Sequence, residues 1–204
     1  MTLRSISSLT IETNERSAVR NVVLYTLMSL DGAVEEPDRY FPEFDKETDA
    51  YEARVIGTQD TVLLGRHMYD EWSRYWPTSD NQPFADFINN VRKYVITSSP
   101  LTTGWTNATA ATGTPADLVA ELKSEPGGDI GVHGSIDLAR SMLREGLVDR
   151  LSLAIAPTLS GVGRRLFDAD LFEDGDARRL ELVQATSTSS GALLVDYRLR
   201  VAQA

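Results

Sequence analysis

One junction in the chain combines the residue types that hold an anionic ligand. Residues 61–69 read TVLLGRHMY, where a run of aliphatic and β-branched residues ends at Gly65 and a helical pattern follows. Backbone N–H groups at a helix start have no partner within the helix and lie at the positive end of its dipole. Arg66 adds a planar guanidinium group that can donate two hydrogen bonds to a phosphate, and His67 adds another donor. The junction predicts a phosphate site, although an arginine at a helix start is also common on plain surfaces.

Two further loops follow strand-like segments in the same way. Residues 97–99 (TSS) offer small hydroxyl groups after a strand, although such residues follow strands in many proteins. In residues 133–136 (HGSI), Gly134 allows a close backbone approach, and Ser135 opens a helix where it could donate to a pyrophosphate. Ligands of open α/β sheets bind outside the carboxyl ends of the strands, where these three loops are expected to meet. Two helix starts at one crevice suit a dinucleotide.

Strands and helices must alternate to bring these loops together, and the hydrophobic pattern predicts that they do. This alternation predicts a largely parallel sheet with helices on both faces, and hence an α/β fold. We expect strands at residues 20–29, 61–64, 93–97, 127–132 and 150–156, and helices at residues 45–57, 67–75, 84–89, 114–124 and 136–145.

The last quarter of the chain has a different pattern. Strands at residues 181–186 and 192–201 are joined by the turn Ser189-Ser190-Gly191, which predicts an antiparallel hairpin on the sheet's edge. Residues 1–18 have no clear period and are expected to be a mobile arm. Residues 19–204 contain no linker, so we expect a single domain.

Composition excludes several classes of function. With 204 residues, 42% of them hydrophobic and 25% charged, the chain has the composition of an ordinary globular protein. Its net charge of −10 argues against a nucleic-acid or anionic-membrane partner, so a phosphate site must be a local island of positive charge. Having no cysteine and two histidines, it is expected to hold no metal. No stretch resembles a membrane span or signal peptide, which predicts a cytoplasmic protein.

The order SLDG, LLGRH, ITSS, HGS and GLVDRLSLAIAPTLSGVGRRLF resembles the dihydrofolate reductase-like superfamily over about residues 20–200. Within it, the chain is similar to the reductase domain of bacterial riboflavin biosynthesis, the RibD C-terminal domain, and its stand-alone relatives. The resemblance implies a mixed, mostly parallel central sheet with flanking helices and NADPH as the cofactor. It implies that the cofactor is bound by Gly65, Arg66, His67, Thr97, Ser98, Ser99, His133, Gly134, Ser135 and Ile136.

The substrate side is less well marked. An ungapped match places Asp49 where folate reductases carry the carboxylate that grips the pteridine ring, although an acidic helix is usually a solvated face. Asp31, in the SLDG turn, is the other candidate for a catalytic acid. Arg164 and Arg165 are candidates for binding a substrate phosphate, or else for surface pairs with Asp168 or Asp170.

The resemblance favours an NADPH-dependent reductase of a small heterocycle, like 5-amino-6-(5-phosphoribosylamino)uracil reductase of riboflavin biosynthesis. One alternative is a non-catalytic nucleotide-binding or regulatory protein, and a weaker one is a dihydrofolate reductase. The family often pairs through its terminal strands, and the hairpin is a sheet edge that needs covering, so a homodimer is expected.

Overall fold

A computed structural model describes residues 20–169, 171–172, 175 and 177–199, so the expected N-terminal arm lies outside the described residues. The strands are β1 Val22–Ser29, β2 Gln59–Gly65, β3 Arg92–Ile96, β4 Ala108–Ala111, β5 Asp129–Val132, β6 Arg150–Ala156, β7 Leu180–Ser187 and β8 Leu193–Leu199. The α-helices are α1 Lys46–Ile56, α2 Arg66–Tyr75, α3 Phe84–Asn90, α4 Pro115–Ser124 and α5 Ile136–Arg144, with short 3-10 helices at Pro37–Arg39 and Trp76–Thr78.

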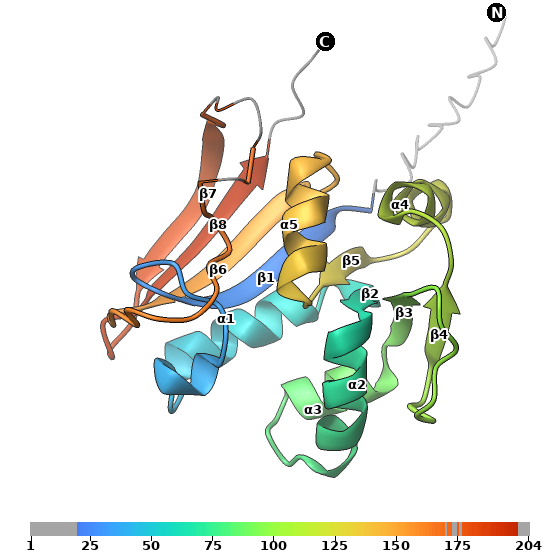
Figure 1. Cartoon of the computed structure of the whole chain (residues 1–204). Coiled ribbons are helices and arrows are strands. Elements are labelled where there is room, and N and C mark those ends of the chain that lie inside the picture. The colour runs from blue at the N-terminus through green and yellow to red at the C-terminus, as the bar shows by residue number, and fades with distance from the viewer. Residues whose placement is uncertain (1–19, 170, 173–174, 176, 200–204) are drawn as a thin grey trace, which may run out of the picture.

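All these strands form one twisted sheet in the order β4-β3-β2-β5-β1-β6-β8-β7 (Figure 1). From β4 to β6 every pair is parallel, while β8 runs antiparallel to both β6 and β7. The prediction of a mixed, mostly parallel α/β sheet with a C-terminal antiparallel hairpin is confirmed. Strand β4 was not predicted, because its segment ATAA has neither the length nor the bulky side chains of a buried strand.

The central strands are apolar on both sides because helices cover both faces of the sheet. In β2, Leu63 packs in one cluster with α4 and α5, whereas its neighbours Val62 and Leu64 pack on the other face against α2 and α3. Residues of α1 pack on that second face as well, with Tyr51 and Val55 against β1 (Figure 1). None of the helices in the described part is long and apolar enough to cross a membrane.

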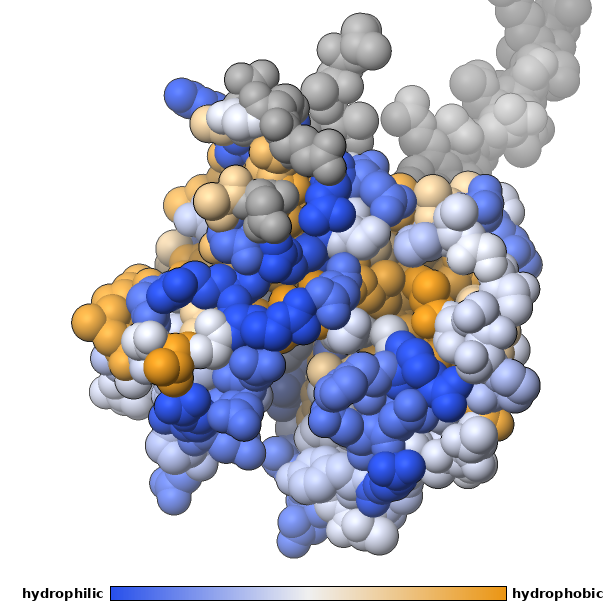
Figure 2. Space-filling view, viewed as in Figure 1, coloured by the Kyte–Doolittle hydropathy of each residue, from blue (hydrophilic) through white to orange (hydrophobic). Residues whose placement is uncertain are grey.

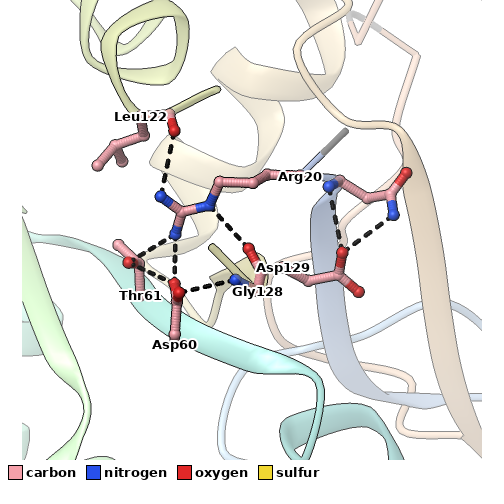
Figure 3. A network of polar contacts seen from close by, with 7 residues as sticks. Arg20, Asp60, Thr61, Leu122, Gly128 and Asp129 are labelled. Atoms are coloured by element: carbon pink, nitrogen blue, oxygen red, sulfur yellow. Dashed lines mark hydrogen bonds and ion pairs between the residues drawn. The ribbon is translucent and has the colours of Figure 1, made fainter. Parts of the chain in front are cut away.

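A polar network closes the amino ends of the strands, at the edge opposite to the predicted site (Figure 3). Arg20, which is 3% exposed, donates through Nε to the carbonyl of Gly128 at 2.7 Å and through Nη1 to that of Leu122 at 3.1 Å. It also pairs with Asp60 and donates to Thr61 Oγ1 at 2.9 Å. One buried guanidinium therefore ties β1 to β2, to the end of α4 and to the start of β5.

We expect Arg20→Ala to lower the free energy of unfolding by about 3 kcal/mol, because buried carbonyl groups would lose their donor. The measurement is the midpoint of urea denaturation. Arg39→Ala is the control, since Arg39 forms an exposed pair with Glu36 and should change stability by less than about 1 kcal/mol. Equal denaturation midpoints for the two variants would contradict the stabilising role assigned to Arg20.

Candidate functional site

The loops that follow β2 and β5 are in direct contact. The backbone N–H of Gly65 donates to the carbonyl of Gly134 at 2.9 Å. A Cβ atom at Gly65 would lie 2.5 Å from Ser135 Oγ and 3.1 Å from Ser135 N, so no side chain fits there. The absence of a side chain at Gly65 is what allows the two loops to approach.

Gly134 is constrained in two ways. Its φ of +125° is a conformation that L-residues rarely adopt, and a Cβ atom there would lie 2.7 Å from the end of the Met68 side chain. Met68 belongs to the first turn of α2, so the loop after β5 runs closely along the start of that helix. Glycine at residue 134 allows this backbone conformation and leaves room for the Met68 side chain.

Two helices begin at this contact with their amino ends uncapped. The residue before α2 is Gly65 and the residue before α5 is Ser135, and no side chain caps either helix. The hydroxyl group of Ser135 makes no hydrogen bond among the described residues. Backbone N–H groups of two first turns, together with the positive ends of two helix dipoles, therefore remain available to an anion.

Arg66 joins the third loop to the other two. Its Nε lies 2.9 Å from both carboxylate oxygens of Asp70, and its Nη1 donates to the carbonyl groups of Pro100 at 3.0 Å and Ser99 at 3.4 Å. The loop after β3 turns at residues 97–99, where the N–H of Ser99 donates to Thr97 Oγ1 at 3.1 Å. The side chains of Ser98 and Ser99 are exposed. The structure thus brings together all three predicted loops.

The two histidines of the predicted cofactor set lie in contrasting places. His67 is exposed on α2, 3.7 Å from Glu71. The ring of His133 is buried, with Nε2 2.7 Å from Gln59 Oε1, and burial lowers its pKa to about 3. The backbone of His133 is therefore part of the loop after β5, whereas its side chain is buried beneath that loop. Ile136, the first residue of α5, is half-buried.

The expected region of excess positive charge is not found around the three loops. Each arginine near the three loops in the described structure has a carboxylate partner: Arg66 with Asp70, Arg164 with Asp137, Arg165 with Asp31, and Arg140 with Asp168. The prediction overlooked that acidic residues from neighbouring elements could neutralise these cations. An incoming phosphate must use the helix N–H groups or replace a carboxylate as the partner of an arginine.

The predicted substrate-binding arginines are both engaged, and with different partners from those expected. Arg164 pairs with Asp137, in the first turn of α5, and this contact raises the pKa of Arg164 and lowers that of Asp137. Arg165 donates through Nε to the carbonyl of Asp31 at 2.8 Å. Asp168 pairs instead with Arg140, and Asp170 lies outside the described residues.

Asp31 holds the loop between β6 and β7 in place, which is a different role from the predicted catalytic acid. Its carboxylate accepts the N–H groups of Ser160 at 2.8 Å and Gly161 at 3.0 Å and the hydroxyl group of Ser29 at 2.7 Å. These hydrogen bonds hold its pKa well below the usual range for a carboxyl group. A carboxylate so fully occupied is a poor proton donor, and a catalytic role of Asp31 stays a prediction.

Asp49, the other predicted acid, lies on the exposed face of α1, and its substrate-binding role stays a prediction. The buried acid of this helix is Glu52, which is 7% exposed and faces Tyr25 of β1. Burial, followed by the negative charge of Asp49, raises the pKa of Glu52 to about 7. The sequence did hold a signal for this residue, since Glu52 is four residues from Thr48 and from Ile56, on the buried stripe of the helix.

Comparisons with known proteins agree with this architecture. Residues 20–194 match the model of the RibD C-terminal domain. The uncharacterized protein YwjB of Bacillus subtilis is 30% identical over 151 residues, which are 72% of this chain and 83% of YwjB.

Two solved structures share the fold. A putative riboflavin biosynthesis protein from Shewanella is 16% identical with a TM-score of 0.72, over 89% of this chain and 99% of that one. A diaminohydroxyphosphoribosylaminopyrimidine deaminase/5-amino-6-(5-phosphoribosylamino)uracil reductase from Thermotoga maritima is 15% identical with a TM-score of 0.62, over 89% of this chain and 57% of that one.

Proposed function

The chain belongs to the family of RibD C-terminal domains, and we propose that it is an NADPH-dependent reductase of a small heterocyclic compound. One observation carries the proposal: two uncapped helix starts meet at glycine loops that leave no room for side chains. This arrangement favours an extended, doubly charged ligand over a neutral one.

The residues at the three loops fit a dinucleotide. The N–H groups of the first turns of α2 and α5 would hold its pyrophosphate, together with the hydroxyl group of Ser135. Arg66 would hold the additional phosphate of NADPH, because its Nη2 makes no hydrogen bond among the described residues and its Nε partner Asp70 is exchangeable. Thr97, Ser98 and Ser99 would flank the adenosine half. The cofactor, when bound, supplies a hydride, and the protein positions the acceptor against it.

The family and the surroundings of the loops support a heterocyclic acceptor. The riboflavin reductase named above acts on a phosphoribosylated pyrimidine, and the acceptor proposed here is a heterocycle of that general kind. Arg164 and Arg165 would bind a substrate phosphate only after leaving Asp137 and Asp31. Their engagement favours, as a second candidate, a nucleotide-binding protein without catalysis.

Equilibrium binding of NADPH and NADH, followed by quenching of Trp72, Trp76 and Trp105, tests the cofactor assignment. We expect NADPH to bind much more tightly than NADH. NADPH oxidation with pyrimidinone, pterin and quinone acceptors then separates the two candidates. Binding without oxidation of NADPH by any acceptor would favour the non-catalytic protein, and absence of binding at about millimolar concentration would exclude both.

We also propose that the protein is a homodimer formed through β7. Among the described residues this strand pairs only with β8, so no described strand covers its outer edge, and Leu182 and Val183 are 56% and 48% exposed. A second copy offers the same edge and the same apolar side chains.

Leu182→Arg should therefore convert the protein into a monomer, because two copies would each place a cation in the shared apolar contact. Light scattering gives the mass. Leu159→Arg, at a side chain that is 71% exposed in a loop, is the matched control and should leave the dimer intact. A monomeric mass for the unmodified protein would remove the proposal.

A further inference from the structure

A cluster of buried polar side chains lies directly beneath the glycine loop after β5. The ring of His133 contacts those of Tyr25, Phe84 and Phe87, with centroids 6.0, 5.5 and 5.8 Å apart. Gln59 reaches His133 from the start of β2, over Gly131, where a Cβ atom would collide with the Gln59 amide. We call Tyr25, Glu52, Gln59 and His133 the Tyr25 cluster.

The Tyr25 cluster is polar but incompletely satisfied. Its members are between 6% and 8% exposed, yet the amide Nε2 of Gln59 has no hydrogen-bond partner among the described residues, and the hydroxyl group of Tyr25 faces the carboxyl group of Glu52. Glu52, from α1, is the acidic group that acts most strongly on Tyr25. Buried polar groups are nearly always paired, so an unpaired amide donor in the same cluster as a buried carboxyl group points to a missing ligand.

The position of the Tyr25 cluster fits the acceptor of the proposed reaction. Tyr25 lies level with the end of β5, since Leu24 pairs with Val132 in the register of the two strands. His133 is followed directly by Gly134, where the nicotinamide end of a dinucleotide would lie. Figure 2 shows the surface hollowed between the residues over α1 and those over α2. An acceptor bound against the Tyr25 cluster would have the aromatic rings of Phe84 and Phe87 beside His133.

We propose that the Tyr25 cluster binds the hydrogen-bonding edge of the acceptor heterocycle and that Glu52 donates the proton that accompanies hydride transfer. This inference rests on the proposed function. The bound cofactor would supply a hydride to the carbon of a C=N or C=O bond in the acceptor, and the π electrons of that bond would move to the nitrogen or oxygen. The proton of the Glu52 carboxyl group goes to the nitrogen or oxygen. The acceptor would thus be reduced at the expense of the cofactor, and the Glu52 carboxylate would regain its proton from water.

The neighbouring titratable groups are unsuited to the same task. Burial keeps the ring of His133 neutral at physiological pH and raises the pKa of Tyr25 well above its usual value, and Tyr51 behind it is likewise shifted upward by burial. Asp49 is exposed and acts on Glu52 through its charge. Glu52, with a pKa of about 7, is both protonated and able to release its proton near neutral pH.

Two measurements on the full chain test this inference. The first needs no cofactor: pterin, a flat pyrimidinone, is titrated at about pH 6 and followed by quenching of Trp72 and Trp76. Trp76 is next to Phe84, with ring centroids 4.7 Å apart. Glu52→Gln should weaken binding by about tenfold through the loss of a hydrogen bond to a buried carboxyl group. Glu121→Gln, on the exposed surface of α4, is the matched control and should bind pterin normally.

The second measurement is the pH profile of kcat/KM for NADPH oxidation, with the acceptor found in the screen. The rate should fall above about pH 7, as Glu52 loses its proton. Glu52→Gln should abolish this limb and lower kcat by about a hundredfold, the contribution of a general acid. Asp49→Asn should move the limb to lower pH, because the Asp49 charge raises the pKa of Glu52.

The outcomes separate the inference from the function on which it rests. An active enzyme in which Glu52→Gln has an unchanged profile would overturn the role of Glu52 and leave the reductase assignment intact. Pterin binding that depends on Glu52, without any NADPH oxidation, would keep the heterocycle site and remove the reductase. Equal pterin affinity in the unmodified protein, Glu52→Gln and Glu121→Gln would overturn the heterocycle site.

Discussion

Arg66→Ala is expected to weaken NADPH binding by about thirtyfold and to leave NADH binding nearly unchanged. A hydrogen-bonded charge pair with a phosphate contributes about 2 kcal/mol, and that is roughly a factor of thirty in the dissociation constant. NADH lacks the additional phosphate and would lose only the link between Arg66 and the carbonyl groups of Ser99 and Pro100. Tryptophan quenching by the two nucleotides measures both constants.

Asp70→Asn is the complementary variant, because Asp70 competes with the phosphate for the Nε of Arg66. Removing the carboxylate charge should tighten NADPH binding by about threefold, in keeping with the small energy of a partly exposed ion pair. Salt should weaken NADPH binding in the unmodified protein and have little effect in Arg66→Ala. If both variants bind NADPH as the unmodified protein does, Arg66 does not contact the cofactor.

Gly134→Ala should reduce the affinity for NADPH and NADH alike by at least about tenfold. The new Cβ atom would lie 2.7 Å from Met68, and alanine at a φ of +125° is strained by about 1–3 kcal/mol. Either effect displaces the loop from the start of α2, where both nucleotides would place their pyrophosphate. The affinities are measured by tryptophan quenching, and the free energy of unfolding by urea denaturation.

Introducing Gly134→Ala into a Met68→Ala variant separates the effect of the contact with Met68 from the effect of backbone strain at residue 134. The shorter side chain removes the contact but leaves the backbone conformation as it was, so we expect only partial recovery of nucleotide affinity. Full recovery would show that Met68 alone excludes a side chain at this position. Normal binding by Gly134→Ala in the original background would contradict the assignment of this loop to the cofactor.

Much of the fold was predictable because the hydrophobic pattern is local. Runs such as TVLL in β2 can be buried only as a strand covered on both faces, and alternation with helices determines a parallel sheet. In a parallel sheet the carboxyl ends of neighbouring strands meet at one edge. The meeting of the loops at Gly65, Ser99 and Gly134 therefore followed from chain order. The short edge strand β4 was missed because ATAA carries too little apolar surface to produce a pattern.

The assignment of polar roles was less predictable, because it depends on contacts between residues far apart in the sequence. Asp31 became a loop anchor through residues about 130 positions away, Ser160 and Gly161. Arg164 found its partner at the start of α5, which no local rule indicates. Whether a charged side chain is free or neutralised is decided by what folds against it.

The sequence by itself determined the α/β architecture, the positions of the three loops and the glycines that let them meet, because each follows from local pattern and chain order. The spacing of Glu52 from Thr48 and Ile56 places these residues on one face of α1, but only the tertiary structure decided that this face is the buried one. The rotation of the helix about its axis is set by packing against β1, which turns Glu52 inward beside Tyr25 and leaves Asp49 in solvent. Burial then gives the two carboxyl groups different chemistry, because desolvation penalises the charged form of Glu52.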